Sequence, residues 1–217
     1  MFRFLLSLLV LLPQIVFASE AVISSTEART WASTKGQELI QALSEKNLSI
    51  KYAKLDELLD ENVNLDYVSK FVIGKYLKKM TPAQKTSYTQ LFHRYVKSLY
   101  KTTNLDFDAH SITFKIDSVT EHEKFATVVC LVTPPQLSND IEIQDIPVKF
   151  KLIRSNHQKI QAVDVEISDI SMVIEYRKRF YQMIKKEGEN IDWFLEKFET
   201  QVKANEESAE TKLKGTV

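Results

Sequence analysis

Residues 159–180 read KIQAVDVEISDISMVIEYRKRF, and the period of the apolar side chains changes within them. Up to residue 168 apolar and polar side chains alternate, so Val163, Val165 and Ile167 are expected on one face of a strand. From residue 173 on, apolar side chains recur every three or four positions, as in a helix. The stretch therefore predicts a strand that leads through one turn into an amphipathic helix, against which the rest of the chain packs.

Before this stretch, helical spacing predicts a helix over 26–45, a second around residues 55–59, a third from Asn64 and a fourth over 82–100. Ser24 with Glu27, and Thr81 with Gln84 around Pro82, have the spacing of capping boxes, which are strong signals for helix starts. Period-two alternation then predicts strands at about 109–119, 124–134, 143–154 and 158–168, joined by short polar turns. Such turns fit antiparallel hairpins, so the expected fold class is α+β, with an antiparallel sheet facing several helices.

After the helix over 172–187, a last helix is expected over 190–203. Residues 204–217 are polar and aperiodic, and we expect a disordered tail there. Residues 1–18 have the pattern of a cleaved signal peptide, with Arg3, an apolar run and a short-residue site before Ser19. The alternative, a membrane anchor, is disfavoured because the run is short and is broken by Pro13 and Gln14. A single domain over 19–203 is expected.

The composition restricts the function classes. The chain of 217 residues has 29 basic and 29 acidic side chains, and this balance disfavours a nucleic-acid binder. With four glycines, a phosphate-binding glycine loop is not expected. None of the four histidines has a partner at metal-ligand spacing, and Cys130 lies in an apolar strand typical of an inert buried thiol. We therefore expect no metal, no cofactor and no catalytic residues.

Two polar features leave alternatives open. Asp164 and Glu166 share a strand face and could form a carboxylate pair, although a solvated sheet face is the favoured interpretation. Arg177 adjoins the apolar helix stripe, where its guanidinium could bind a phosphate at the rim of a cavity or form a structural ion pair. Large apolar groups are abundant on both layers, and periodicity does not distinguish a filled core from an apolar pocket.

Three stretches of the sequence resemble the MlaC family, the periplasmic phospholipid-binding (toluene tolerance) proteins of Gram-negative bacteria. Val72–Tyr76 (VIGKY) resembles its V-L-G-x-aromatic run, and TPAQK at 81–85 with later aromatics resembles its T-P-E-Q-R helix. Residues 163–180 resemble its D-V-x-x-x-G-V-S-L-V-x-N-Y-R-x-x-F signature. Asp169-Ile170 replaces the family's glycine, Glu175 its asparagine, and Gln161-Ala162 stands where its tryptophan is usual.

The resemblance covers roughly residues 25–200 and implies a soluble phospholipid carrier with no enzymatic activity. It implies a twisted four-stranded sheet packed with helices, in an arrangement like that of nuclear transport factor 2 with an extra helical lobe. The cargo would be a phospholipid, carried across the periplasm between an outer-membrane lipoprotein complex and an inner-membrane ABC transporter with its MCE-domain subunit. Related proteins are associated with hopanoid export, so another lipid is an alternative cargo.

Taking the acyl chains to lie between the sheet and the helices, we predict the following lining: Val72, Tyr76, Phe92, Tyr95, Val128, Cys130, Val148, Phe150, Val165, Val173, Tyr176 and Phe180. Arg177 is the candidate for the headgroup side of the mouth. Two other classes remain open. One is a periplasmic protein-interaction module with a solid core and no lipid. The other is an enzyme, for which Asp164 is the one weak candidate.

Overall fold

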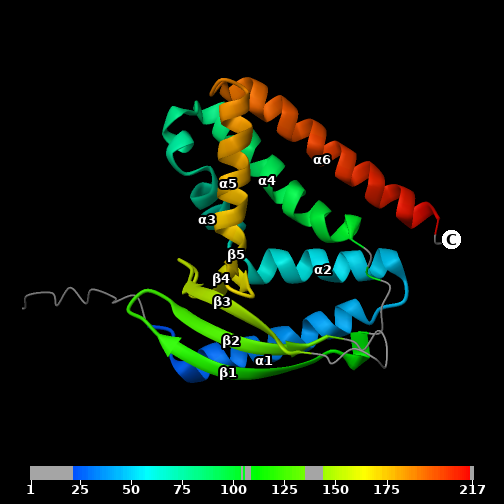
Figure 1. Cartoon of the computed structure of the whole chain (residues 1–217). Helices are drawn as coiled ribbons and strands as arrows, with labels where there is room; N and C mark the ends of the chain where they lie inside the picture. The colour runs from blue at the N-terminus through cyan, green and yellow to red at the C-terminus, as the bar shows by residue number, and fades with distance from the viewer. Residues whose placement is uncertain (1–21, 104, 106–108, 135–143, 216–217) are drawn as a thin grey trace, which may run out of the picture.

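The computed structural model describes residues 22–103, 105, 109–134 and 144–215, so the predicted signal peptide lies outside the described residues. An antiparallel sheet with two helices forms one lobe, and the remaining helices form a second lobe above it (Figure 1). The helices are α1 (Ser25–Leu43), α2 (Leu48–Asn62), α3 (Leu65–Ile73), α4 (Pro82–Thr102), α5 (Met172–Lys186) and α6 (Ile191–Lys214), with 3-10 turns η1 (Gly74–Lys79) and η2 (Ala109–Ser111). The strands are β1 (Thr113–Glu121), β2 (Ala126–Thr133), β3 (Ile146–Arg154), β4 (Ile160–Ile167) and β5 (Ile170–Ser171).

The α+β prediction is confirmed. The sheet has the order β1-β2-β3-β4-β5, with every neighbouring pair antiparallel, and contains the four expected strands plus the two-residue β5. Residues Ser168 and Asp169, with φ of 47° and 64°, make the two-residue turn between β4 and β5. Two positive φ values in such a turn match the right-handed twist of the strands that it joins.

One face of the sheet is apolar along three strands. Cys130 pairs with Val148, Val128 with Phe150, and Phe150 with Val165. Because residues directly opposite one another share a face, these five side chains lie on the same side of the sheet. Helix α1 packs mainly over β1 and β2 on this side, through small residues that let it approach closely: Ala28 and Ala32 belong to the same buried cluster as Ala126 and Val128.

The expected alternation in β4 is wrong at one position. Lys151 pairs with Asp164 and Leu152 pairs with Ala162, so Val163 is an extra residue in β4. Such a bulge turns the neighbouring side chains to opposite faces. Ala162 is buried under α1, whereas Val163 is buried against the helices of the second lobe. Strand β4 therefore contributes to both cores.

The second lobe has an aromatic core. Helices α4 and α6 run side by side in the same direction, and α5 stands against them (Figure 1).

Both predicted capping boxes are present at the helix starts: Ser24 with Glu27 at α1, and Thr81 with Gln84 at α4. Because the caps satisfy N–H groups that have no partner inside the helix, the sequence signals mark the true starts.

The prediction of a disordered tail from residue 204 is wrong as far as Lys214, where α6 ends, and residues 216–217 lie outside the described residues. Helix α4 supplies the contacts that order it. Asn205 donates to Ser98 Oγ (2.9 Å), Arg94 pairs with both Glu206 oxygens (2.9 and 2.6 Å), and Ala209 is buried. The segment is polar because most of its surface faces water, and polarity alone did not reveal a helix held along one side.

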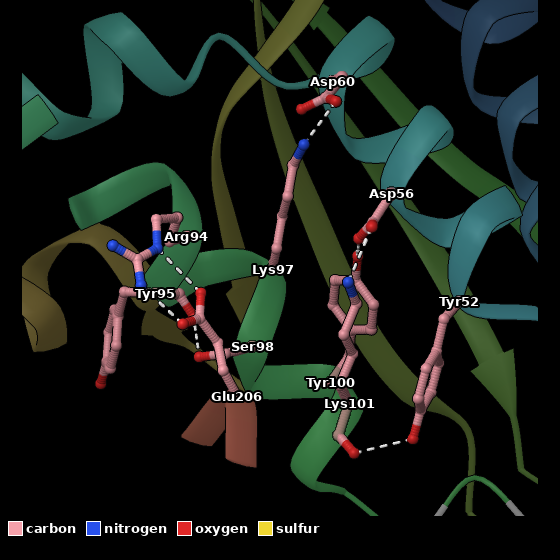
Figure 2. A network of polar contacts seen from close by, with 10 residues as sticks. All are labelled: Tyr52, Asp56, Asp60, Arg94, Tyr95, Lys97, Ser98, Tyr100, Lys101 and Glu206. Atoms are coloured by element: carbon pink, nitrogen blue, oxygen red, sulfur yellow. Dashed lines mark hydrogen bonds and ion pairs between the residues drawn. The ribbon is translucent and has the colours of Figure 1, made fainter. Parts of the chain in front are cut away.

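Besides the shared strand β4, contacts of α2 and of the residues that follow it join the two lobes. At the end of α2, Val63 makes a single parallel bridge to Ala162, and Asn64 N–H donates to the carbonyl of Ala162 (2.9 Å). Farther along, long polar side chains connect α2 to α4, and Figure 2 shows them. The contacts are Tyr52 Oη to the carbonyl of Lys101 (2.8 Å), Tyr100 Oη to Asp56, Lys101 Nζ to Asp56 (2.7 Å) and Lys97 Nζ to Asp60 (2.6 Å).

None of the helices in the described part of the chain is long and apolar enough to cross a bilayer.

Candidate functional site

The predicted lining residues fall into two separate sets. Val128, Cys130, Val148, Phe150 and Val165 share the apolar face of the sheet. The other set lies in the second lobe and consists of Val72, Tyr76, Phe92, Tyr95, Val173, Tyr176 and Phe180. The structure therefore does not bring the whole predicted set around one space.

The helical set forms part of a filled core. Ring centroids of neighbouring aromatic residues lie 4.9 to 6.4 Å apart, a spacing typical of packed aromatic side chains. The rings come from Tyr88, Phe92, Tyr95, Tyr176, Phe180, Phe194 and Phe198. Tyr76 is fully buried and donates its hydroxyl to Glu189 (3.0 Å). In this lobe the aromatic stripe is core packing.

The sheet set is only half covered. Val148, Phe150 and Val165 are half-buried, although their neighbours Val128 and Cys130 are buried. The apolar surface then continues to the end of β4: Ile167 lies opposite Val148 and is 40% exposed, and Ile170 lies opposite Ile167 and is 51% exposed. We call Val148, Phe150, Val165, Ile167 and Ile170 the apolar strip.

Sequence reasoning found the interior half of the apolar strip and missed its outer half. The signal available was the pair of isoleucines on either side of Ser168-Asp169, since large apolar residues are unusual beside a tight polar turn. It also missed Trp31 of α1, whose ring meets Phe150 edge-to-face with centroids 5.9 Å apart. The Trp31 indole N–H is buried and has no acceptor among the described residues.

Cys130 has the environment expected from its sequence context. It is a free, buried thiol in β2, and burial raises its pKa to about 11. Because the thiolate is the reactive form, a thiol with so high a pKa is inert at neutral pH.

Arg177 has a structural role in this lobe. Its Nε donates to the carbonyl of Phe71 (2.9 Å), Nη2 donates to the same oxygen, and the guanidinium lies 3.9 Å from the centre of the Phe71 ring. The side chain thus satisfies a carbonyl near the end of α3 and fixes α5 against it. These donors serve the protein backbone, and the guanidinium does not reach the apolar strip by any described contact.

Gly74 explains why residues 72–76 (VIGKY) and residues 176–180 (YRKRF) are found in the same sequence. Gly74 has φ of 51°, and a Cβ at this position would lie 2.3 Å from Tyr181 Oη and 3.2 Å from Arg177 Nη2. Only glycine combines that backbone conformation with so close an approach. The two stretches therefore meet where α3 ends against α5, and Lys75 N–H donates to Tyr181 Oη (3.1 Å).

Asp164 caps a helix. Its carboxylate accepts from Ser171 Oγ (2.6 Å) and from Val173 N–H (3.2 Å) at the start of α5. Glu166 pairs with Lys149 across the sheet. The imagined carboxylate pair is thus divided between a helix cap and a cross-strand ion pair. Within the described ranges, no three His, Cys, Asp or Glu side chains are grouped closely enough to hold a metal ion.

A hollow lies between α3 and the turn that joins β3 to β4, with a volume of about 700 Å³. It is lined by Asp60, Val63, Asn64, Leu65, Asp66, Tyr67, Lys70, His93, Ile153, Arg154, Ser155, Asn156, His157, Lys159 and Gln161, and we call it the polar cleft. Sequence reasoning missed it because residues 60–70 and 153–161 are brought together only by the packing of the two lobes.

A family model for the MlaC protein matches residues 34–200, which is more than half of the chain. The chain belongs to the MlaC family. The stretches that carried the resemblance are those that cap α4 and α5 and that bring α3 against α5, so in this chain they meet local folding requirements. No curated protein matches the chain in sequence.

Among solved structures, this MlaC chain is similar to the phospholipid-binding protein from Ralstonia solanacearum in complex with a phospholipid. The TM-score is 0.62 at 15% identity, covering 81% of this chain and 98% of the other. The likeness shows a shared fold. The iota-carbonic anhydrase from a cyanobacterium, complexed with bicarbonate, is more distant, with a TM-score of 0.42 at 14% identity over 67% of this chain and 92% of the other.

Proposed function

We propose that this protein is a non-enzymatic phospholipid carrier of the periplasm, which encloses acyl chains against the apolar strip. Its cargo passes between an outer-membrane lipoprotein complex and an inner-membrane ABC transporter with its MCE-domain subunit. Membership of the MlaC family and the fold shared with a phospholipid-bound protein support this proposal. The observation that carries it is the apolar strip itself, which runs from half-buried Phe150 to exposed Ile170.

The apolar strip suits an acyl chain for an energetic reason. Each methylene that leaves water contributes about 0.8 kcal/mol, so a chain laid along the strip is held by many small contributions. A carrier with this design needs no nucleophile and no metal, because it lowers the cost of crossing water and breaks no covalent bond. The exposed isoleucines at the outer end provide an apolar path from the surface to Phe150.

Trp31 adds a polar contact to the same site. A buried indole N–H without an acceptor is costly, and such groups in native proteins call for an explanation. Trp31 touches Phe150, so its donor lies beside the apolar strip. In the loaded protein the Trp31 N–H donates to an ester carbonyl of the lipid, which fixes the depth to which the acyl chains enter.

The filled aromatic core of the second lobe favours a second candidate, a periplasmic interaction module that binds a protein through the apolar strip and holds no lipid. Native mass spectrometry distinguishes the two. Mature protein, residues 19–217, is purified from the periplasm without detergent, and a carrier shows a bound mass that solvent extraction identifies as phospholipid. An interaction module shows the bare protein mass and takes up no lipid from liposomes.

A matched pair of variants then places the lipid. Phe150→Asp puts a charge on the apolar strip and should abolish lipid co-purification, because burying a carboxylate beside acyl chains is costly. Val129→Asp puts the same charge on the opposite face of the neighbouring strand, beside Lys149, and should leave the lipid bound. Equal lipid occupancy in the two folded variants would exclude the apolar strip as the site.

A further inference from the structure

The polar cleft has an apolar floor and charged walls. Val63, Leu65 and Ile153 form its floor, where the edges of the two lobes meet. The aromatic ring of Tyr67, 47% exposed, stands at its side. A site with this composition accommodates the carbon skeleton of a small ligand while its walls contact a charged group.

Two of the charged groups in the cleft are already neutralised by ion pairs. Asp60 accepts from Lys97 (2.6 Å), and Arg154 pairs with Glu27 (2.8 Å). The charged groups that remain are Lys70, Lys159 and one acid, Asp66, so the cations of the cleft are in excess.

Two lysines of the cleft have no acidic partner in the described part of the chain. Lys70 projects from the last turn of α3, and Lys159 stands at the start of β4 on the opposite wall. The imidazole of His157, in the turn between the strands, lies on the same wall as Lys159. Ammonium groups without an ion-pair partner on two facing walls of a partly enclosed cleft attract an anion more strongly than the same groups on a flat surface.

Hydrogen bonds hold the two walls in place. In the β3–β4 turn, Ser155 N–H donates to the carbonyl of Lys159 (2.8 Å) and Gln158, with φ of 62°, donates to the carbonyl of Ser155 (2.8 Å). Asn64, at the start of α3, donates from Nδ2 to Gln161 Oε1 (3.2 Å) and so ties α3 to β4. Both lysines are therefore mounted on a cross-linked frame, which reduces the entropy lost when a ligand binds.

We propose that the polar cleft binds a phosphate ester, with Lys70 and Lys159 contacting the phosphate and Tyr67 packing against the organic part. Lysine is a common phosphate ligand as a point charge. Two ammonium groups balance the charge of a phosphate monoester, which is about −2, and exceed the single negative charge of a diester. The ester belongs either to a lipid headgroup or to a free organic phosphate. The inference does not require the carrier function, because a free phosphate ester would bind without any lipid.

The test is isothermal titration calorimetry of delipidated mature protein with sn-glycerol 3-phosphate, and with glycerol as the uncharged probe. Saturable binding of glycerol 3-phosphate alone is expected. The double variant Lys70→Ala/Lys159→Ala should bind at least about tenfold more weakly, since charge-assisted contacts are lost. Lys70→Arg/Lys159→Arg should keep the binding, which separates loss of charge from loss of fold.

The matched control is Lys46→Ala/Lys186→Ala, which removes two exposed lysines outside the cleft and should bind like the parent protein. Absence of saturable binding to the parent protein, or equal weakening in the two alanine double variants, would overturn the proposal.

A second arm identifies the source of the phosphate. The protein is loaded from dioleoyl phosphatidylglycerol vesicles and titrated again. Loss of glycerol 3-phosphate binding on loading assigns the cleft to the lipid headgroup, and unchanged binding assigns it to a free phosphate ester. If no lipid is taken up while glycerol 3-phosphate still binds, the carrier function fails and the phosphate site stands.

Discussion

Glu27 connects the start of α1 to the sheet through both of its carboxylate oxygens. One oxygen accepts from Ser24 N–H (3.0 Å) and the other from Arg154 Nη2 (2.8 Å). The Ser24 backbone hydrogen bond, followed by the Arg154 and Ser24 side chains, lowers the pKa of Glu27 from 4.5 to about 2. A carboxyl whose pKa falls on folding stabilises the protein above its unfolded pKa.

We therefore expect the contribution of Glu27 to be complete above about pH 5 and to be lost as pH falls toward 2. Glu27→Gln should be less stable than the parent protein at pH 7, and the two should converge near pH 2. Urea unfolding at a series of pH values measures this difference. The control, Glu123→Gln in the exposed β1–β2 turn, should run parallel to the parent protein. A constant gap for Glu27→Gln across the whole pH range would refute the assignment.

Helix α6 shows how one side of an element is enough to order it. Its last three turns contact α4 through Asn205, Glu206, Ala209 and Lys212, the last of which donates to the carbonyl of Thr103 (3.1 Å). Ending the chain after Lys203 removes all of these contacts. We expect the free energy of unfolding to fall by about 2 kcal/mol, as several polar contacts of modest strength are lost together.

Urea unfolding measures the effect of this truncation. As a control, Glu210→Ala/Lys214→Ala alters an exposed pair with a separation of 3.9 Å and should change the free energy by less than about 0.5 kcal/mol. A truncated chain with the midpoint of the full chain would show that the last turns of α6 contribute no stability.

Elements were predictable from the sequence wherever a local signal decided them. Two such signals are the capping residues Ser24 and Thr81 and the alternation in β2 and β3. Each acts within a few positions of the sequence, so it predicts its element without knowledge of the residues that pack against it. Contacts between residues far apart in the sequence were not predictable. Val163 turns to the second lobe because of one extra residue opposite β3, and the guanidinium of Arg177 meets a carbonyl about a hundred positions away.

In the candidate site, too, local patterns were predictable and long-range packing was not. Periodicity correctly grouped Val128, Cys130, Val148, Phe150 and Val165 on one sheet face, because alternation along paired strands has that consequence. It grouped Val72, Phe92 and Phe180 with them because helical apolar stripes look alike whether they face a cargo or another helix. Only the position of α6, whose Phe194 and Phe198 fill the space, separates the two cases.

At the scale of the whole molecule, the lobes are joined along α2 and α4 by polar side chains. Asp56 accepts from both Tyr100 Oη and Lys101 Nζ, as Figure 2 shows, and all three side chains are partly buried. Asp56→Ala leaves a tyrosine hydroxyl and an ammonium without their acceptor. We expect a loss of about 2 kcal/mol in the free energy of unfolding and faster amide exchange in α2.

A double-mutant cycle with Tyr100→Phe isolates the contact and should give a coupling energy of about 1 kcal/mol between Asp56 and Tyr100. Hydrogen exchange followed by mass spectrometry locates the loosening, with the α1 segment next to Ala28 and Ala32 as internal control. Additive effects of the two substitutions, together with unchanged exchange in α2, would mean that the lobes are held elsewhere.

The bridge between Val63 and Ala162 has a consequence for association. With β5, it occupies the outer side of β4, so that edge of the sheet is shielded against a strand from another molecule. At the other edge, β1 carries Lys115 and is interrupted by a bulge at Asp117, and both features discourage strand addition. A chain that displays isoleucines to water is thereby protected from polymerising through its backbone, and its encounters with other molecules are left to side chains.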